Sequence, residues 1–521
     1  MNNIYLIGFM GSGKTTTGKL ISKTLGRKFI DMDELISSMF GMSVNRIFET
    51  HGEDGFRKAE ARILMNLSKA GNLVISTGGG IYENTTNRER IKKSGISIYL
   101  DASLNEIRKR LKEDEIAQRP LWRRPSSVEK LFLSRREHYL DSDHKIAVDG
   151  LSPNKVASIV CSFVYPERDY FVNYEGYQSR VKVVWDGPGT VGELVRGRKT
   201  AILTDQNVQR LHLDRYLEIL DDPTVISLKP GEKTKTFRMA NFIYEKLLQA
   251  RIGRGDVLLA IGGGVITDIG GFVASTYKRG IDFVLVGTTM VACVDAAIGG
   301  KSAIDVGNIK NSVGLFSKPL ASVLDLQSMN TLRSNQVSEG LIEAYKTGLV
   351  ADPQLYAYMN RNVSLFKKKS IIELAEVLTT SALAKCSIVS KDFRERDLRR
   401  ILNLGHTYGH AVESYNNYSI SHGLAVAKGI TVSTHLSCHR GLILADDAAT
   451  IIETLDRIYS NEAKLPTAEQ AWEIMLNDKK NKDGKITFVL LNGIGKCIMS
   501  DDVTKHELDL AIEKLRATRN D

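Results

Sequence analysis

The segment GFMGSGKT, residues 8–15, has the residue types and the spacing of a phosphate-binding loop. It matches G-x-x-x-x-G-K-[ST] and stands between an apolar run and a segment with helical periodicity. Small residues let backbone N–H groups surround phosphate oxygens, and the N-terminus of the following helix adds positive potential. The first part of the chain is therefore predicted to bind a nucleoside triphosphate with Mg²⁺. The residues expected around the phosphates are Gly11, Ser12, Gly13, Lys14, Thr15 and Thr16, with Thr15 as a magnesium ligand.

Acidic and basic residues after this loop supply the other groups that phosphoryl transfer needs. Asp31 and Asp33 follow the apolar residues of a predicted strand, and their spacing places both on the same side of its end. One carboxylate could support magnesium while the other accepts a proton from a hydroxyl group, although a solvated acidic pair is the alternative. Arg57 and Arg135 suit a carboxylate-bearing substrate, because a guanidinium can bind a carboxylate through two hydrogen bonds. Arg119, in AQRPLWRRP, is expected at the tip of a lid that reaches the transferring phosphate.

Histidines in the second half of the chain have the spacing of a metal site. In NLGHTYGHAVE, His406 and His410 are four residues apart, and a helix would place both on one face. SISHG adds His422, and EGLIEAYKTG adds Glu343 with Lys346 one turn later. Two or three histidines with a glutamate and one open position are typical of catalytic zinc, whereas core or surface histidines are the alternative. On spacing alone, both His406 and His410 are metal ligands.

A second glycine-rich turn, residues 262–268, follows the apolar run VLLAI. No lysine follows the glycines, and Thr267 stands where the dinucleotide fingerprint G-x-G-x-x-G requires its third glycine. Asp205, at the end of another predicted strand, could bind a ribose hydroxyl. Lys301 and Lys310 would suit the phosphate and carboxylate of an anionic substrate if they converge on one cleft.

Bulk composition places these groups in a soluble enzyme. A chain of 521 residues exceeds a single core, and 42% hydrophobic with 25% charged residues is ordinary for globular domains. The net charge of +10 fits anionic metabolites, and no basic run interleaved with aromatics favours nucleic acid. Five scattered cysteines without C-x-x-C indicate reduced thiols and a cytoplasmic location. We find no signal peptide and no apolar stretch long enough to span a membrane, so that neither membrane nor nucleic acid is an expected partner.

Alternating strands and helices must position the candidate residues. In residues 1–161 the strands NIYLIGF, KFIDMD, NLVISTGG and GISIYLD alternate with helices, which predicts a parallel sheet with helices on both faces. Residues 162–176 are aromatic, polar and proline-bearing, and are expected to form a linker. Residues 177–325 are again α/β, with the strands RVKVVW, KTAILTD, TVISLKPG, DVLLAIGGG and DFVLVGTT. Residues 326–521 are expected to be mainly helical.

The ordered motifs of the first segment resemble those of shikimate kinase. The shared set is the G-x-x-x-x-G-K-T loop, D-x-D, F-R-K-x-E, a glycine triplet, R-P-L and R-x-x-x-Y. The resemblance implies a P-loop kinase domain that uses ATP with Mg²⁺ to phosphorylate shikimate, with Asp33 as the base. Asp31 would support magnesium through water, Arg119 would be the lid arginine, and Arg110 or the neighbouring Arg108 would lie near adenine, with Arg110 preferred. The implied shikimate-binding residues are Asp33, Arg57, Gly79 and Arg135.

From about residue 170 to the end, the chain resembles 3-dehydroquinate synthase. The motifs include T-D-x-N-V, P-G-E-x-x-K, GGGVxxDxGGF, V-D-x-x-x-G-G-K-x-A, E-x-x-K-x-G, N-L-G-H-x-x-G-H-A and H-G-x-A-V. The resemblance implies an α/β half that binds NAD⁺, followed by a mainly helical half that holds Zn²⁺ or Co²⁺. Glu343, His406 and His422 would be the metal ligands, which leaves His410 as a nearby catalytic histidine. Thr267 and Leu424 depart from residues that are common in the family.

Two further sets follow from the same resemblance. The implied NAD contacts are Asp205, Asn207, Glu232, Lys235, Gly263, Gly264, Val265, Asp268, Thr288, Thr289 and Thr331. The implied substrate and catalytic groups are Arg279, Asp295, Lys301, Lys310, Asn311, Lys346, Lys385, Arg399 and Asn403, with Lys479 or Lys480 as one more.

The sequence thus predicts a bifunctional enzyme of the shikimate route that acts on small molecules, with a homodimer formed through the synthase part. Three alternatives stay open at this stage. The second half could be a metal-dependent polyol dehydrogenase, which needs less machinery for anionic substrates. It could be a sugar-phosphate cyclase for a different sugar, or one half could be an inactive nucleotide-regulated binding module.

Overall fold

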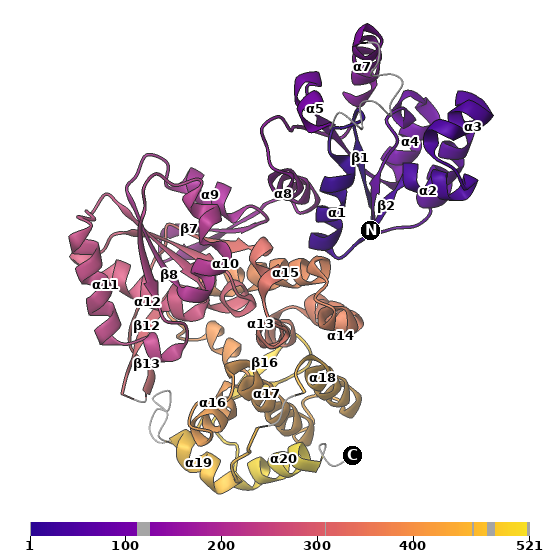
Figure 1. Ribbon diagram of the computed structural model, residues 1–521. Helices are drawn as coiled ribbons and strands as arrows, with labels where there is room; N and C mark the ends of the chain where they lie inside the picture. The colour runs from indigo at the N-terminus through magenta and orange to yellow at the C-terminus, as the bar shows by residue number, and fades with distance from the viewer. Residues whose placement is uncertain (1, 112–124, 308, 461–462, 477–484, 518–521) are drawn as a thin grey trace. The chain divides into compact units, whose positions relative to one another are not determined.

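The computed structural model describes residues 2–111, 125–307, 309–460, 463–476 and 485–517 (Figure 1). The chain forms two compact units, Met1–Pro166 and Glu167–Asp521. The first unit is built around a parallel sheet and the second around a mainly parallel one, which confirms the predicted fold class. Among the described residues, no helix is both long and apolar enough to cross a membrane.

The first unit has a five-stranded sheet in the order β2-β3-β1-β4-β5, and every pairing is parallel. Its central strand β1 (Asn3–Ile7) is buried at all five residues. The other strands are β2 (Lys28–Asp31), β3 (Leu73–Ser76), β4 (Gly95–Asp101) and β5 (His144–Ala147). The helices are α1 (Lys14–Leu25), α2 (Met32–Phe40), α3 (Val44–Leu67), α4 (Thr85–Ser94), α5 (Leu104–Arg110), α7 (Pro125–Tyr139) and α8 (Pro153–Val164).

The strand order places the ends of β1, β2 and β3 at one edge of this sheet. Leu6 pairs with Ser76 and Ile30 pairs with Ile75, so the three strands end nearly level. The turn from β1 into α1 needs glycine, because Gly11 and Gly13 have φ of 81° and 93°, values that side-chain-bearing residues rarely adopt. The phosphate-binding loop and the residues after β2 and β3 therefore lie together.

The second unit has a seven-stranded sheet in the order β6-β7-β14-β11-β10-β8-β9. β6 (Arg168–Tyr174) is antiparallel to β7 (Tyr177–Val184), and the remaining pairs are parallel. The parallel strands are β8 (Thr200–Asp205), β9 (Thr224–Leu228), β10 (Val257–Gly262), β11 (Asp282–Gly287) and β14 (Ala321–Asp325). Strands rich in valine, isoleucine and leucine pack against α9 (Gly187–Leu194) and α10 (Gln206–Leu217) in one continuous core.

The connections reverse direction between β8 and β10. From β8 the chain moves outward to β9, returns to β10 and continues on the other side to β11. Ligands of open α/β sheets bind outside the carboxyl ends of the strands at such a reversal. α12 (Gly264–Thr276) begins at this point, directly after β10. α11 (Phe237–Gln249) connects β9 with β10.

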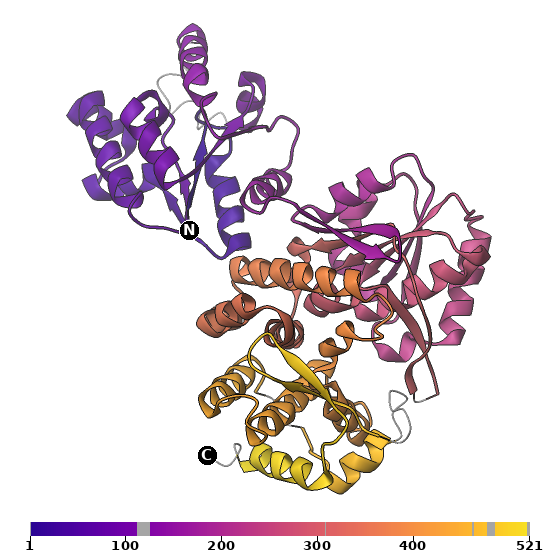
Figure 2. The ribbon, with the colours of Figure 1, turned by 180° about the vertical axis from the view of Figure 1, so that it is seen from behind.

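The helical half of this unit is assembled around α17 (His422–His439), which is buried along most of its length. α17 contacts α13 (Ser334–Ala351), α16 (His406–Tyr415), α18 (Ala445–Ile458) and α20 (Lys505–Ala517). The hairpin of β15 (Phe488–Leu491) and β16 (Cys497–Ser500) lies beside α17 (Figure 2). The remaining helices are α14 (Pro353–Lys367), α15 (Ile371–Lys391) and α19 (Ala468–Leu476).

Two expectations about local structure were wrong, and several strands were not predicted. Most of the segment expected as a linker, residues 162–176, is regular: α8 ends at Val164, and β6 adds an edge strand to the second sheet. β14 and the hairpin of β12 (Lys301–Val306) and β13 (Ile309–Phe316) were not predicted. Asp31 and Asp33 do not share one side of a strand, because Asp33 already lies in α2, whose N-terminus Asp31 caps.

Candidate active sites

The phosphate-binding loop forms the first site. Lys14 Nζ donates to the carbonyl oxygens of Gly8 and Phe9 at 2.8 and 3.0 Å, so its ammonium lies over the loop. Thr15 Oγ1 donates to Asp31 Oδ2 at 2.7 Å. The other oxygen of Asp31 accepts the backbone N–H of Asp33 at 3.0 Å. The capping contacts fix the Asp31 carboxylate, and Thr15 and Asp31 together offer two oxygen ligands beside the loop.

An arginine pocket lies next to that loop. Arg57 pairs with Glu60 at 2.8 Å and with Glu53 at 3.1 Å, and Arg135 pairs with Glu83 at 2.7 Å. Gly79 and its neighbour leave room for both guanidinium groups, since a Cβ at Gly80 would stand 2.1 Å from Arg57 Nη2. A Cβ at Gly79 would be 3.4 Å from Arg135 Nη1. The pocket can therefore present two guanidinium groups to an anion.

Glu60 is a buried carboxylate of this pocket to which the sequence analysis gave no role. Its side chain is fully buried, and within the described residues its Oε1 has no hydrogen-bond partner. Burial raises the pKa of Glu60, although Arg57 opposes the shift. A Cβ at Gly78 would lie 3.0 Å from Asp33 Oδ1 and 2.2 Å from Glu60 Oε1, so both carboxylates border the same glycine. The F-R-K-x-E motif could have predicted the contact between Glu60 and Arg57, because Glu60 lies about one helical turn after Arg57.

Arg108 and Arg110 differ in their surroundings. Arg110 Nη1 donates to the carbonyl oxygen of Ser12 at 3.2 Å, and its Nη2 donates to that of Val148 at 2.9 Å. Arg108 is exposed. Arg110 is thus the arginine that lies against the phosphate-binding loop, whereas Arg119 falls outside the described residues.

The second site is a cleft of about 1530 Å³ between the α/β and helical halves of the second unit. All eleven residues assigned to NAD by resemblance line it, from Asp205 on β8 to Thr331. Gly263 and Gly264 form its wall at the start of α12, where a Cβ on Gly263 would approach Thr289 Cγ2 to 3.1 Å. Thr288 Oγ1 is buried and has no hydrogen-bond partner among the described residues. This wall therefore has the backbone access and the spare polar group that a dinucleotide requires.

Hydrogen bonds and ion pairs fix several side chains on the α/β side of the cleft. Asp205 Oδ1 accepts the backbone N–H groups of Asn207 and Val208, so the carboxylate is fixed at the start of α10. Lys235 Nζ lies 2.5 Å from Asp268 Oδ2 and also donates to Asn311. Burial raises the pKa of Asp268, even though Lys235 opposes this shift. His212, which was not predicted, lies 2.9 Å from Thr331 Oγ1 through its Nε2.

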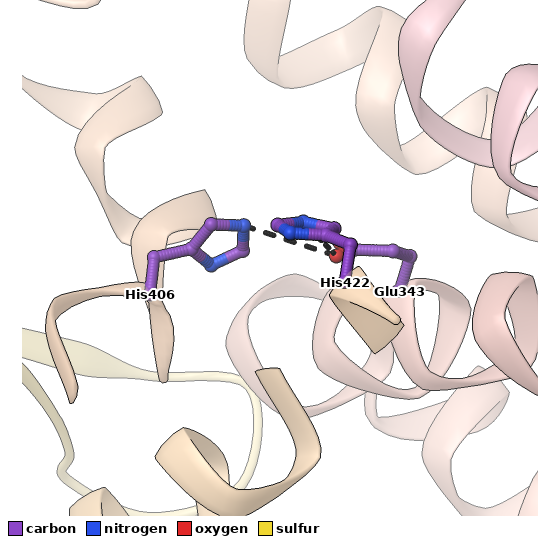
Figure 3. Close-up of side chains that lie close together, drawn as sticks. All are labelled: Glu343, His406 and His422. Carbon is purple, nitrogen blue, oxygen red and sulfur yellow. Dashed lines mark ion pairs between the residues drawn. The ribbon is translucent and has the colours of Figure 1, made fainter. Parts of the chain in front are cut away.

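Glu343, His406 and His422 converge in the helical half with ligand atoms within 4.8 Å of one another (Figure 3). Glu343 Oε1 lies 3.3 Å from His422 Nε2 and 3.8 Å from His406 Nε2. Two imidazole nitrogens and one carboxylate oxygen form the donor set of a catalytic zinc or cobalt site with an open position. The His410 ring centroid is 5.5 Å from that of His406, so His410 lies beside this group.

Close helix packing brings these ligands together. A Cβ at Gly429 on α17 would be 1.7 Å from the carbonyl oxygen of Gly405, and one at Gly409 would be 3.0 Å from that of Ala425. Since no side chain intervenes at these glycines, α16 and α17 approach closely. His406 begins α16 and His422 begins α17, and across this close packing their ring centroids lie 5.4 Å apart.

Charged side chains contact the candidate metal ligands. Lys346 pairs with Glu343 at 2.5 Å, and Glu413 Oε1 lies 3.4 Å from His422 Nδ1. Burial opposes a charge on His422, but Glu343 and Glu413 outweigh it and raise the pKa of His422 to about 10. Burial likewise opposes the charge on Glu413, and His422 with Lys310 lowers its pKa to about 2.

Basic and polar groups complete the cleft. Lys385 is buried and pairs with Asp295; burial disfavours the Asp295 charge, but Lys385 outweighs it and lowers the pKa of Asp295 to about 2. Arg399 donates to the carbonyl oxygens of Gly299 and Phe393, and burial lowers its pKa. Other cleft residues with predicted substrate or catalytic roles are Lys301, Lys310, Asn311, Lys346, Asn403 and His410.

One predicted substrate residue lies outside the cleft, two lie outside the described residues, and one residue with contacts in the cleft was not predicted. Arg279 lies on an exposed turn with φ of 67° and does not line this cleft. Lys479 and Lys480 fall outside the described residues. Glu395, which was not predicted, pairs with Lys301 and accepts from Asn403 Nδ2 at 2.6 Å. Glu395 reaches Lys301 and Asn403 only because of how the chain folds before α16, and no local sequence motif predicts these contacts.

Family models match residues 10–164 and 225–481. Residues 10–164 match the model of shikimate kinase. Residues 225–339 match that of the N-terminal part of 3-dehydroquinate synthase, and residues 340–481 match that of its C-terminal part.

Individual proteins give the same division. The chain is 32% identical over 501 residues to the bifunctional shikimate kinase/3-dehydroquinate synthase of Thermotoga maritima, covering 95% of this chain and 96% of that protein. It is 39% identical over 310 residues to the 3-dehydroquinate synthase of Geobacter metallireducens, covering 58% of this chain and 86% of that protein. A solved 2-epi-5-epi-valiolone synthase from Streptomyces hygroscopicus, with NAD⁺ and Zn²⁺ bound, superimposes with a TM-score of 0.62 at 24% identity. That likeness covers 66% of this chain and 98% of the solved one and shows the fold.

Proposed function

Since the chain belongs to the bifunctional shikimate kinase/3-dehydroquinate synthase family, we propose how its two sites perform the two reactions. The protein is an enzyme with both activities. The first unit phosphorylates shikimate to shikimate 3-phosphate. The second converts 3-deoxy-D-arabino-heptulosonate 7-phosphate to 3-dehydroquinate and phosphate.

In the kinase unit, the loop backbone and Lys14 would hold the phosphates of ATP. The lysine that now contacts Gly8 and Phe9 would turn to the outer phosphates, which are stronger acceptors for an ammonium group. Thr15 and Asp31 would hold Mg²⁺, Asp31 through water. Arg110 would lie near the adenine because it is fixed against the loop.

The arginine pocket would bind shikimate. Arg57 and Arg135 would hold its carboxylate through charge-assisted hydrogen bonds, and the absence of a side chain at Gly79 would leave space for the ring. Asp33, on the first turn of α2 beside this pocket, would accept the proton of the attacking hydroxyl. Arg119 would reach the transferring phosphate.

In the synthase unit, the α/β wall fits NAD⁺ and the Glu343, His406 and His422 group fits Zn²⁺ or Co²⁺. When bound, NAD⁺ would take up and return a hydride, and the divalent cation would polarise substrate hydroxyl groups. Asp205 would orient the cofactor through a ribose hydroxyl, and Gly263 and Gly264 would let the backbone approach its pyrophosphate. His410 lies beside the metal position and could exchange a proton with substrate.

The anionic groups of the substrate would be bound from both halves of the cleft. Lys301, Lys310 and Asn311 come from the β12–β13 hairpin, while Lys346, Lys385 and Arg399 come from the helical half. Cationic groups aimed at a departing phosphate stabilise the charge that develops on it. This convergence of cations, a metal-type group and a cofactor wall in one cleft is the observation that carries the synthase proposal.

An assay of the purified chain with both substrates tests these proposals. We expect phosphate release from the heptulosonate phosphate without net NADH, and shikimate phosphorylation that depends on ATP and Mg²⁺. A polyol dehydrogenase would instead accumulate NADH stoichiometrically with a polyol, which would reject the synthase assignment. A zinc-selective chelator with excess Mg²⁺ should stop the synthase reaction and spare the kinase.

We also propose a homodimer formed through the synthase unit. Arg279 supports this proposal, because a residue assigned to substrate lies exposed outside the cleft of its own chain. Sedimentation equilibrium of the full chain tests it, and a monomer at assay concentrations would reject it.

A further inference from the structure

We propose that Glu413 is a positioning residue that holds the His422 imidazole with its Nε2 facing the metal position. The inference rests on the metal site proposed above and adds a side chain outside its ligand set. Glu413 Oε1 lies 3.4 Å from His422 Nδ1, while His422 Nε2 lies 3.3 Å from Glu343 Oε1. The imidazole therefore bridges two buried carboxylates, one on each side of the ring.

The other histidine of the group shows the same arrangement with a different partner. His406 Nδ1 lies 3.2 Å from the carbonyl oxygen of Leu404. A carbonyl or carboxylate oxygen can only accept a hydrogen bond. When a metal ion takes the Nε2 lone pair, each histidine therefore keeps its remaining proton on Nδ1, facing that outer oxygen. Outer partners of this kind set the tautomer and orientation of metal-binding histidines. The backbone does this for His406, and Glu413 does it for His422.

His422 needs such a partner more than His406 does. It begins α17 directly after the capping residue Ser421, and its side chain is 38% exposed, compared with 13% for His406. Packing alone therefore leaves its ring more freedom to rotate. A carboxylate also increases the basicity of the imidazole more than a neutral carbonyl does, which strengthens the metal bond.

Glu413 itself is rigidly placed. It lies seven residues after His406 on α16, so that the helix turns both side chains to the same face. Its side chain is only 3% exposed, and Lys310 from the β12–β13 hairpin pairs with the same oxygen at 3.1 Å. Glu413 thus connects a metal ligand of the helical half with a substrate lysine of the α/β half.

Metal affinity of the full chain tests the inference, with Zn²⁺ measured by competition against a chromophoric chelator. Glu413→Ala should raise the zinc dissociation constant roughly 10–100-fold. Glu413→Gln should raise it less, because the amide oxygen still accepts from Nδ1–H. In the Co²⁺-loaded protein, both variants should shift the visible absorption of the ion, a readout of ligand geometry that a general loss of stability would not reproduce.

Two variants serve as controls. Glu339→Gln removes a carboxylate that also lines the cleft and whose hydrogen-bond partner is Ser421. Lys310→Met removes the other partner of Glu413. Each should leave the zinc dissociation constant within about threefold of the wild-type value, well below the effect expected for an outer-sphere partner. If either weakens zinc as much as Glu413→Ala does, general charge or the lysine contact is responsible and the inference is wrong.

The result also separates this inference from the metal site on which it rests. A wild-type chain that binds neither Zn²⁺ nor Co²⁺ would reject the metal site. A wild-type chain that binds zinc while Glu413→Ala binds it equally well would reject only the role of Glu413. Should Glu413→Ala fail to fold, the isosteric Glu413→Gln carries the test, and an unchanged zinc affinity and cobalt spectrum in that variant would overturn the inference.

Discussion

Thr15 and Asp31 are joined by a 2.7 Å hydrogen bond across the edge of the first sheet, although they belong to different elements. Thr15 lies on α1 and Asp31 ends β2, so the parallel order of the sheet brings the two oxygens together. We proposed that this pair holds Mg²⁺.

Asp31→Asn should therefore raise the Mg²⁺ concentration needed for half-maximal kinase activity, roughly tenfold. Asparagine caps a helix about as well as aspartate, so α2 should keep its start while the charge is lost. The measurement is a Mg²⁺ titration at saturating ATP. An unchanged half-saturation point would mean that Asp31 has only its structural role.

The two activities should be separable by single substitutions. Lys14→Met should lower kinase turnover at least about 100-fold, since it removes a cation from the transferring phosphate. His406→Ala should lower synthase turnover by a similar factor, because it removes a proposed metal ligand. Each variant should retain the other activity, and loss of both in a folded variant would contradict independent sites.

Gly80→Ala should weaken shikimate binding without affecting ATP. The new Cβ would stand 2.1 Å from Arg57 Nη2, so the guanidinium must move from the pocket. Loss of one such contact corresponds to about 1.4 kcal/mol, or a tenfold higher KM for shikimate. Gly255→Ala is a matched control, because a Cβ there meets no atom within 4 Å and should change neither KM. An equal increase in the KM for ATP would point to a wider disturbance.

Asp295→Asn should destabilise the second unit by leaving Lys385 buried without its anionic partner. Removing one member of a buried pair costs about 3–5 kcal/mol, and the 40% exposure of Asp295 reduces this to about 2 kcal/mol. Urea unfolding followed by fluorescence measures the change. The exposed Asp221→Asn should stay within about 0.5 kcal/mol of wild type, and a comparable loss there would refute the argument.

His435 should make the chain sensitive to mild acid. Burial lowers the pKa of His435 to about 4, from 6.5 in the unfolded chain, and its Nε2 has no hydrogen-bond partner among the described residues. Between these values the unfolded state binds the extra proton, so stability is full above pH 6.5 and falls as the pH drops toward 4. The slope is at most about 1.4 kcal/mol per pH unit.

His435→Leu should flatten the stability profile across that window, as measured by urea midpoints at several pH values. Substituting the exposed His439 of the same helix should leave the profile unchanged. Parallel profiles for wild type and His435→Leu would assign the acid sensitivity to other groups.

Local chemistry explains what could be predicted from sequence. The phosphate-binding loop and the turn after β10 carry their conformation in their own glycines and apolar strands, and the predicted fold class was confirmed. β6 escaped prediction because it is an edge strand in which only Val172 and Tyr174 are buried, so it lacks the continuous apolar run of a central strand. The β12–β13 hairpin escaped because only Ser302 and Ile304 in it are buried, so it lacks the apolar run of a core strand.

Side-chain contacts between different helices and strands could not be predicted from local sequence patterns. The link from Glu395 to Lys301 and the contact of Glu413 with His422 depend on how helices meet, which single-segment patterns do not record. Spacing alone also made His410 a ligand equal to His406, whereas the group that converges consists of Glu343, His406 and His422.

His406, His410 and Glu413 lie on one face of α16 because they are spaced four and three residues apart. Each residue added to an α-helix turns everything beyond it by about 100°. A single insertion between His406 and His410 would therefore direct the later two side chains away from the cleft at once. Members of this family can vary in sequence along α16, but we expect its length to be the same in all that remain active.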